Sequence, residues 1–265
     1  MTRAAWLTDI HLNFLKPVQL EKFYQQIKQA EPDCVLISGD IGEAPRLKYY
    51  LQQLESRLPY PIYFVLGNHD YYGASIENVD ELVREMTDTS PHLHWLTIEG
   101  VVELSPTVGL IGHDGWADGR YGDYAASTVM LNDYLAIRDF VGMTKVQRLA
   151  LLNSLGDAAA RYVLEWLPVA LTRYDHVFFM THVPPFTQAC LHEGQSYNDE
   201  WLPHYASKAI GDALIKVMRD YPKKTLTVLC GHTHGRVEAH ILDNLLVMTG
   251  GAEYSRPEVQ RVFEM

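Results

Sequence analysis

Five short motifs along the chain carry side chains that can bind metal ions. They are Asp9-x-His11, Gly39-Asp40, Gly67-Asn68-His69-Asp70, Thr181-His182 and Gly231-His232-Thr233-His234. Carboxylate, amide and imidazole groups are common oxygen and nitrogen ligands of divalent metal ions. Two such ions held close together chiefly catalyse hydrolysis, because they activate water and stabilise charge on the reacting group. The motifs therefore predict a two-metal hydrolase.

The spacing within the motifs suits shared coordination. In an extended segment, residues i and i+2 project to the same side, so Asp9 and His11 can bind one cation together. His232 and His234 have the same spacing, although a loop could direct their rings to different metals. Asp40 could bridge two metals, because its two oxygens offer several lone pairs.

The types of the candidate ligands restrict the metals. Asn68 would add a neutral carbonyl oxygen, and no cysteine occurs in the five motifs. Mixed Asp, Asn and His coordination suits Mn²⁺, Fe²⁺ or Fe³⁺, Zn²⁺ and Co²⁺, and it argues against Ca²⁺ or a structural cysteine-zinc site. We expect two metal ions of this group as cofactors.

The elements that must position the motifs alternate between strands and helices. Apolar runs predict strands at 4–8, 34–38, 62–66, 94–96, 101–104, 108–111, 177–180 and 225–230, and a closing hairpin at 236–241 and 244–249. Amphipathic patterns predict helices at 18–30, 45–56, 76–86 and 206–221. A further helical segment begins after Thr144, where Gly156 should break the helix and Pro168 should end or kink the next one. This alternation indicates α/β architecture, with each motif at a strand end.

Two irregular stretches, 113–140 and 184–205, are longer than most connections within a domain. The first contains His113, Arg120 and Tyr121, and the second contains His192. Such side chains could hold an anionic, ring-bearing substrate, with Arg120 as the best single candidate, although the aromatic residues could equally pack the loops onto the core. We expect these four residues and Asn68 to contact substrate.

Composition limits the class of protein. The 265 residues are 47% hydrophobic and 21% charged, as in ordinary soluble domains, and we expect one domain over 1–265. The net charge of −11 argues against a nucleic-acid partner but not against a small anion bound at metals. Three cysteines give no disulfide framework, and no apolar run reaches the length of a membrane helix. These features favour a cytoplasmic protein that does not bind membranes.

In order and spacing, the motif set resembles the calcineurin-like metallophosphoesterases. Their pattern D-x-H, G-D, G-N-H-[DE], H and G-H-x-H is present in full between Asp9 and His234. The resemblance implies an α/β sandwich of two facing mixed sheets flanked by helices, with the site at the strand C-termini. It also implies two metal sites that share Asp40 as a bridge. The first would use Asp9, His11, Asp40 and His234, and the second Asp40, Asn68, His182 and His232.

The resemblance further implies a mechanism. A hydroxide held between the metals would attack phosphorus in line, and His69, which is not a ligand, would protonate the leaving oxygen. General acids of this kind contribute about 10²–10⁴-fold to the rate. The expected substrate is a small anionic phosphoester.

One departure from the family pattern bears on the substrate. The phosphoprotein phosphatase branch carries G-D-x-x-D-R-G, in which the arginine binds phosphate. In this chain Glu43 stands at the second acid, and Ala44 and Pro45 stand where that branch has the arginine and the last glycine. The departure favours a phosphodiesterase. A phosphomonoesterase, including a protein phosphatase, is the first alternative, a nuclease is a weaker one, and a non-enzymatic metal-binding scaffold module is the alternative of another class. Glu43 could still orient His69.

Overall fold

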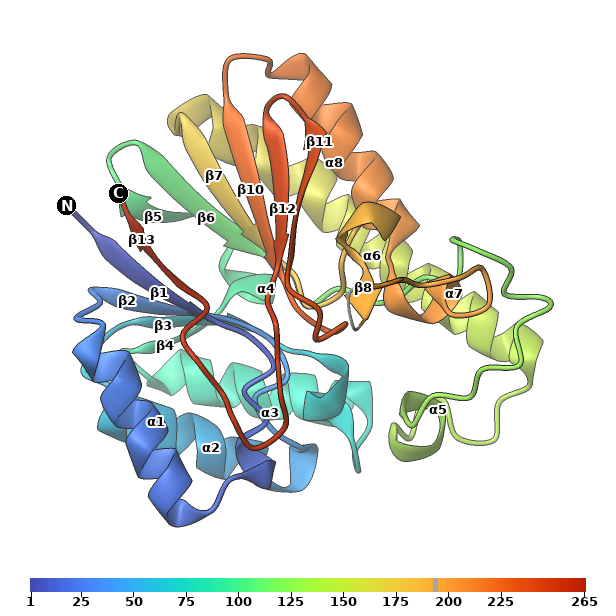
Figure 1. Ribbon diagram of the computed structural model, residues 1–265, viewed down its shortest axis with the longest axis horizontal. Helices are drawn as coiled ribbons and strands as arrows, with labels where there is room; N and C mark the ends of the chain where they lie inside the picture. The colour runs from blue at the N-terminus through green and yellow to red at the C-terminus, as the bar shows by residue number, and fades with distance from the viewer. Residues whose placement is uncertain (193–194) are drawn as a thin grey trace.

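Two mixed β-sheets face each other in the structure (Figure 1), a computed structural model that describes residues 1–192 and 195–265. Within these residues, one sheet has five strands in the order β13-β1-β2-β3-β4. The other has six, in the order β11-β12-β10-β7-β6-β5, and β8 and β9 form a separate hairpin. The prediction of an α/β sandwich with two facing mixed sheets is confirmed.

The first sheet is parallel except at one edge. Strands β1 to β4 run parallel, and β13 joins β1 antiparallel. Its strands are β1 (Arg3–Leu7), β2 (Cys34–Ser38), β3 (Ile62–Val65), β4 (Leu93–Trp95) and β13 (Arg261–Glu264). Its outer face is covered by α1 (Pro17–Gln29), α2 (Ala44–Arg57) and α3 (Ile76–Thr89) (Figure 1).

The second sheet has a parallel centre and antiparallel edges. Strands β6, β7, β10 and β12 are parallel, while β5 and β11 pair antiparallel at the two sides. Its strands are β5 (Val102–Ser105), β6 (Val108–Gly112), β7 (His176–Met180), β10 (Thr225–Cys230), β11 (Val237–Leu242) and β12 (Leu245–Thr249). Helices α6 (Lys145–Arg173) and α8 (Lys208–Asp220) pack on its outer face (Figure 1).

Alternation along the strands divides the apolar side chains between layers. In β2, Val35 and Ile37 pack against the helices, whereas Leu36 packs in the layer between the sheets beside Phe178 and Leu229 of the second sheet. Both faces of the central strands are therefore buried. This explains why those strands are continuous apolar runs rather than alternating patterns.

The prediction that Gly156 breaks the helix after Thr144 is wrong, because α6 continues to Arg173 with Pro168 inside it. Thr144 caps the helix through a hydrogen bond from the backbone of Gln147, as its capping box predicts. At Gly156, a Cβ atom would lie 2.5 Å from the Cβ of Asp118, so the glycine allows the loop to pack closely on the helix. Burial of the helix against the second sheet outweighs the hydrogen bond that Pro168 cannot donate.

The last strand, β13, was not expected from the sequence, because only four residues, two of them charged, form it. The closing hairpin of β11 and β12 was expected, and its turn lies at Asp243 and Asn244. Short elements complete the described chain: η1 (Leu12–Phe14), η2 (Asn68–Tyr71), α4 (Leu96–Glu99), α5 (Asp133–Ala136), η3 (Thr187–Ala189), β8 (Leu191–His192), β9 (Gln195–Ser196) and α7 (Leu202–Tyr205). None of the described helices combines the length and the apolar character that crossing a bilayer would require.

Candidate two-metal site

The five motifs meet where the C-terminal ends of both sheets come together. Asp9 and His11 follow β1, Asp40 follows β2, and Asn68 follows β3. The second sheet supplies His182 after β7, and His232 and His234 after β10. Parallel strands deliver their carboxyl ends to one edge of a sheet, which is why residues far apart in sequence share this site.

One group of side chains forms a cluster suited to a first metal. Asp9, His11, Asp40 and His234 each offer one ligand atom, and these atoms all lie within 4.8 Å of one another. His11 Nε2 lies 3.3 Å from His234 Nε2 and 3.6 Å from Asp40 Oδ2, and His234 Nε2 lies 3.4 Å from Asp9 Oδ1. Carboxylate oxygens and imidazole nitrogens that converge in this way fit a divalent cation.

A second group lies on the other side of Asp40. His182 Nε2 lies 3.4 Å from Asp40 Oδ1, so the two oxygens of this carboxylate face different clusters. Asn68 Oδ1 lies 3.0 Å from both His182 Nε2 and His232 Nδ1. This arrangement allows Asp40 to bridge two metals.

Hydrogen bonds fix which nitrogen of each ring faces this second group. His182 Nδ1 donates to the carbonyl of Ser38 at 2.9 Å, and His232 Nε2 donates to the carbonyl of His204 at 3.2 Å. In a neutral His232, Nδ1 then presents a bare lone pair to the carbonyl oxygen of Asn68 at 3.0 Å. Acceptors that face one another without a proton repel unless a cation lies between them. The donor chemistry therefore fits a second metal ion.

The electrostatics of the protein without metals agree with this reading. Although burial acts to raise it, hydrogen bonding and charge from His234 and His182 lower the pKa of Asp9 to about 2. Burial lowers the pKa of His11 and His232 to about 4, so both rings are neutral, as metal ligands must be. Burial opposes a proton on His182, but the charge of Asp40 raises its pKa to about 10.

The backbone at the ligands is strained. Of the seven described non-glycine residues with positive φ, five are candidate ligands, namely Asp9 (48°), His11 (39°), Asp40 (54°), His232 (68°) and His234 (58°). Such conformations cost free energy in non-glycine residues and persist where the surrounding fold enforces them. At Gly231, a Cβ would lie 2.0 Å from Asp9 Oδ2, so the glycine of the last motif is needed for this close approach.

His69 lies beside the first cluster without joining it. Its ring stacks on Tyr72, with centroids 4.3 Å apart, and meets His11 edge-on at 4.8 Å. The backbone N–H of His69 donates to Asp40 Oδ1 at 2.9 Å, and its Nε2 lies 4.0 Å from Asp40 Oδ2. The ring lines the cavity over the ligands, where it can reach a departing group.

The structure corrects the expectation that Glu43 orients His69. Glu43 is the residue before α2, and its carboxylate accepts a hydrogen bond from Asn13 Nδ2 at 3.3 Å. Among the described residues, His69 Nδ1 has no hydrogen-bond partner. The ring of His69 is held by Tyr72 and His11 through packing instead.

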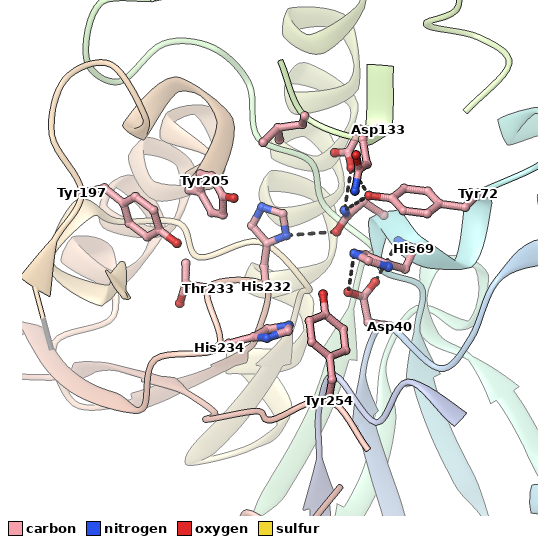
Figure 2. A pocket seen from close by; sticks show the side chains of 13 residues that line it. Asp40, His69, Tyr72, Asp133, Tyr197, Tyr205, His232, Thr233, His234 and Tyr254 are labelled. Carbon is pink, nitrogen blue, oxygen red and sulfur yellow. Dashed lines mark hydrogen bonds and ion pairs between the residues drawn. The ribbon is translucent and has the colours of Figure 1, made fainter. Parts of the chain in front are cut away.

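Asp133 is a residue of this site that sequence reasoning missed. Its Oδ1 accepts hydrogen bonds from Asn68 Nδ2 at 2.8 Å and from Tyr72 Oη at 2.6 Å (Figure 2). Because the amide nitrogen of Asn68 is held by Asp133, its carbonyl oxygen must point to the histidines. The same carboxylate fixes the Tyr72 ring under His69. Asp133 lies on α5 within the irregular stretch 113–140, where no motif marks it.

Asp70, the last residue of the Gly-Asn-His-Asp motif, supports the loops rather than binding metal. Its carboxylate accepts the backbone N–H groups of Ile41, Gly42 and Gly67, each at 2.8 Å. It thereby ties the loop after β2 to the loop after β3. The motif itself was the signal for this residue, which is fully buried.

Three of the residues expected to contact substrate lie elsewhere. Arg120 pairs with Asp118 at 3.2 Å and Asp157 at 2.7 Å, and it lines a different surface depression. Tyr121 Oη donates to the carbonyl of Pro185 at 3.4 Å. His113 packs edge-on against Tyr162 at 5.3 Å, and burial lowers its pKa.

None of these three residues is among the described residues that line the cavity over the ligands. Of the other two candidates, Asn68 does line it. His192 is described only in its backbone, as part of β8, so its predicted contact lies outside the described residues.

A cavity of about 250 Å³ opens over the ligands (Figure 2). Four tyrosines contribute to its wall: Tyr72, Tyr197, Tyr205 and Tyr254. Tyr254, from the loop between β12 and β13, packs against His11 at 4.8 Å and His234 at 5.2 Å. No lysine or arginine occurs among the described residues that line it. The cavity is therefore aromatic and acidic apart from whatever charge bound metals supply.

Comparison with known proteins agrees with the fold and the donor set. The profile of the calcineurin-like phosphoesterase family matches residues 2–236. The chain therefore belongs to the calcineurin-like phosphoesterase family, and the predicted resemblance is confirmed.

Curated relatives match parts of this chain. It is 32% identical over 156 residues to an uncharacterized metallophosphoesterase of Campylobacter jejuni, covering 57% of this chain and 40% of that protein. It is 34% identical over 88 residues to a transmembrane protein with metallophosphoesterase domain from Danio rerio, covering 32% of this chain and 20% of that protein. The chain thus spans well under half the length of these relatives.

Solved structures match the fold along nearly the whole chain. The phosphopantetheinyl hydrolase of Mycobacterium tuberculosis superposes with a TM-score of 0.68 at 15% identity, covering 96% of this chain and 90% of that one. A dimetal phosphatase from Danio rerio gives 0.56 at 13% identity, covering 97% and 89%. At these identities the likeness shows the fold alone.

Proposed function

We propose that this protein is a metal-dependent phosphodiesterase that hydrolyses a small anionic phosphodiester. Family membership and the cluster of Asp9, His11, Asp40 and His234 support a metallophosphoesterase. The observation that carries the diester assignment is the absence of lysine and arginine from the described lining of the cavity. Phosphate monoesters carry about two negative charges near neutral pH and phosphodiesters only one.

The charges of the site favour the singly charged ester. Two divalent ions would bring four positive charges, and Asp9, Asp40 and Asp133 bring three negative ones. At most one positive charge remains for the phosphoryl group, which a diester neutralises. A doubly charged monoester would need a further cationic side chain, such as a bidentate arginine. Arg120, the arginine that the sequence favoured for substrate contact, is paired with Asp118 and Asp157 instead.

The metals would be held by the two donor sets already described, with Asp40 between them. When bound, such ions supply Lewis acidity and make water reactive near neutral pH. Their identity is proposed from the donors alone, which suit Mn, Fe, Zn or Co.

The residues of the chain supply orientation and a proton. His69 lines the cavity, and its Nε2 lies 4.0 Å from Asp40 Oδ2, beyond hydrogen-bond distance. This nitrogen is therefore available to protonate the leaving oxygen. Tyr72 keeps the ring in place by stacking, and Asp133 keeps both Tyr72 and Asn68 in place. The four tyrosines reduce the water that reaches the reacting group.

The test compares a diester with a monoester that share a leaving group. The protein loaded with Mn²⁺ should hydrolyse bis-p-nitrophenyl phosphate with a higher kcat/KM than p-nitrophenyl phosphate. Asp40→Asn should abolish turnover of both while leaving the fold intact by circular dichroism. Faster turnover of the monoester would overturn the diester assignment. Metal binding without turnover of either ester would favour a non-enzymatic scaffold module.

We also propose a reducing, cytoplasmic setting. Cys34, Cys190 and Cys230 are buried and not in disulfides, which suits such a compartment.

A further inference from the structure

A second depression adjoins the metal cavity and shares two of its walls. It has a volume of about 470 Å³ and is lined by Gln195, Ser196, Tyr197, Asn198, Trp201 and Tyr205. Tyr197 and Tyr205 also line the cavity over the ligands. The two spaces therefore adjoin at these two tyrosines, and we call the second depression the aromatic slot.

We propose that the aromatic slot binds a planar, uncharged ring carried by the substrate. This inference rests on the proposed phosphodiesterase function and specifies its substrate class. Tyr197 and Tyr205 stack on each other with centroids 4.3 Å apart and planes 17° apart, so an outer face of this pair can form an aromatic wall. Trp201 lies 6.1 Å from Tyr205 and is 39% exposed, so its indole is accessible to a ligand. Rings stack favourably on such side chains.

The chemistry of the slot selects against a charged group. Its described lining contains no acidic or basic side chain, so neither a second phosphate nor an ammonium group would find a partner there. Gln195, Ser196 and Asn198 place amide and hydroxyl groups around the aromatic wall. These groups can exchange hydrogen bonds with the edge of a ring that contains nitrogen or oxygen atoms.

The segment that forms the slot is anchored to the rest of the protein. Asp199 accepts a hydrogen bond from the backbone of Asp123 at 2.7 Å, and Glu200 accepts one from Thr128 Oγ1 at 2.6 Å. Asn198 Oδ1 accepts the backbone N–H of Trp201 at 3.2 Å. Residues of the irregular stretch 113–140 therefore hold the slot segment in place through hydrogen bonds, whereas Arg120 of the same stretch does not line the cavity.

The position of the slot indicates which ester group carries the ring. Tyr205 packs against His232, with centroids 5.0 Å apart, whereas His69 packs against Tyr72 and His11. Figure 2 shows Tyr197 and Tyr205 on one side of His232 and His69 on the other. The leaving oxygen departs toward His69, so the ring belongs to the group that stays on phosphorus. The product is then a ring-bearing phosphate monoester and a free alcohol.

The test uses diesters that share p-nitrophenol as leaving group and differ in the retained group. Ethyl, phenyl and thymidine 5′ esters of p-nitrophenyl phosphate are compared with the Mn²⁺-loaded protein. We expect kcat/KM to be roughly tenfold higher for the ring-bearing esters, within the range that one stacked ring contributes. A higher value for the thymidine ester than for the phenyl ester would identify a nucleobase, and equal values an aryl group.

Variants connect this preference to the slot. Trp201→Ala should lower the ratio of ring-bearing to ethyl ester turnover toward one, and Trp201→Phe should restore most of it. Tyr49→Ala, which removes a 42% exposed tyrosine on α2, is the matched control and should leave the ratio unchanged. A preference that survives Trp201→Ala, or equal turnover of all three esters, would overturn the inference.

Binding of products separates this inference from the proposed function. Phenyl phosphate should bind the Mn²⁺-loaded protein roughly tenfold more tightly than methyl phosphate by calorimetry, and Trp201→Ala should remove the difference. This measurement needs no turnover. If no diester is hydrolysed but the difference is found, the proposed function fails and the slot stands. Equal affinities in the wild-type protein would refute the slot even if diesters are hydrolysed.

Discussion

Replacement of Asp133 by alanine tests how the second metal ligand set is held. The carboxylate accepts hydrogen bonds from Asn68 and Tyr72 on the same oxygen. Without it, the amide of Asn68 can rotate, and its carbonyl oxygen no longer has to face His182 and His232. The buried phenol of Tyr72 also loses its acceptor, which loosens the ring beneath His69.

The two consequences have different magnitudes and different readouts. Loss of the partner that orients a ligand typically lowers metal affinity about 10–100-fold, which is about 1.4–2.7 kcal/mol. An unpaired buried hydroxyl costs about 1–3 kcal/mol in the free energy of unfolding. Metal titration measures the first effect and urea unfolding the second.

The assay measures Mn²⁺ binding to the metal-free protein by calorimetry, together with the number of metal ions bound per protein molecule. Asp133→Ala should weaken one of two binding events about 10–100-fold. The other binding event should keep its affinity, because Asp133 is not part of the cluster of Asp9, His11, Asp40 and His234. Asp133→Asn should restore part of the affinity, since its amide oxygen can still accept a hydrogen bond. Asp139→Ala is the matched control, because Asp139 lies in the same stretch and accepts the backbone N–H of Ile76 at 2.8 Å, away from the ligands.

Two results would refute this reasoning. One is unchanged affinity at both metal sites in Asp133→Ala with normal folding. The other is an equal loss in Asp139→Ala, which would show that destabilisation of the stretch, and not orientation of Asn68, weakens the metal.

Three further predictions concern other parts of the structure. His69→Ala should lower kcat about 10²–10⁴-fold for alkyl leaving groups and much less for p-nitrophenol, which needs no acid; equal losses for both would contradict its role as proton donor. Gly231→Ala should destabilise the protein by about 1–3 kcal/mol, measured by urea unfolding, because its Cβ would overlap Asp9; an unchanged unfolding midpoint would contradict the need for glycine. Burial and the charge of Asp114 raise the pKa of Asp80 from 3.8 to about 7. Between these pH values the native state holds more protons than the unfolded chain, so stability falls as pH rises; Asp80→Asn should remove this fall and be the more stable protein at pH 8, and identical pH profiles of the melting temperature would refute it.

The hydroxyl of Tyr71 lies between the carboxyl groups of Asp80 and Asp114, and its hydrogen bond acts to lower the pKa of Asp80 against the larger effect of burial. Tyr71 Oη lies 3.0 Å from Asp80 Oδ1 and 3.1 Å from Asp114 Oδ2. A phenol has one proton to donate, so it cannot satisfy two carboxylates at once. Asp114 also accepts hydrogen bonds from Leu66 N and Trp95 Nε1, and its nearby charge adds to burial in raising the pKa of Asp80.

The ligands could be predicted because local sequence determines them. Each candidate ligand directly follows an apolar strand, and strand ends gather at one edge of a sheet. Asp133 could not be predicted in this way, because its partner Asn68 lies 65 positions earlier and only the fold brings them together. Arg120 was misjudged for the same reason, since the carboxylates of Asp118 and Asp157 that neutralise it are apparent only in space.

The helices show the complementary limit. Gly156 and Pro168 are local signals against a helix, but burial of α6 against the second sheet overrides both. The strand β13 carries too weak a local signal to be recognised, and it forms because the edge of β1 is available to pair with it.

The division of the ligands between the two sheets has a consequence for the order of assembly. Asp9, Asp40 and Asn68 lie in the first third of the chain, whereas His232 and His234 follow more than 160 residues later. During synthesis, strands β1 to β4 of the first sheet can fold on their helices well before the histidines that follow β10 leave the ribosome. A nascent chain would then hold exposed carboxylates without their imidazole partners and bind metal only weakly. We therefore expect tight metal uptake only late in folding, after the two sheets have docked.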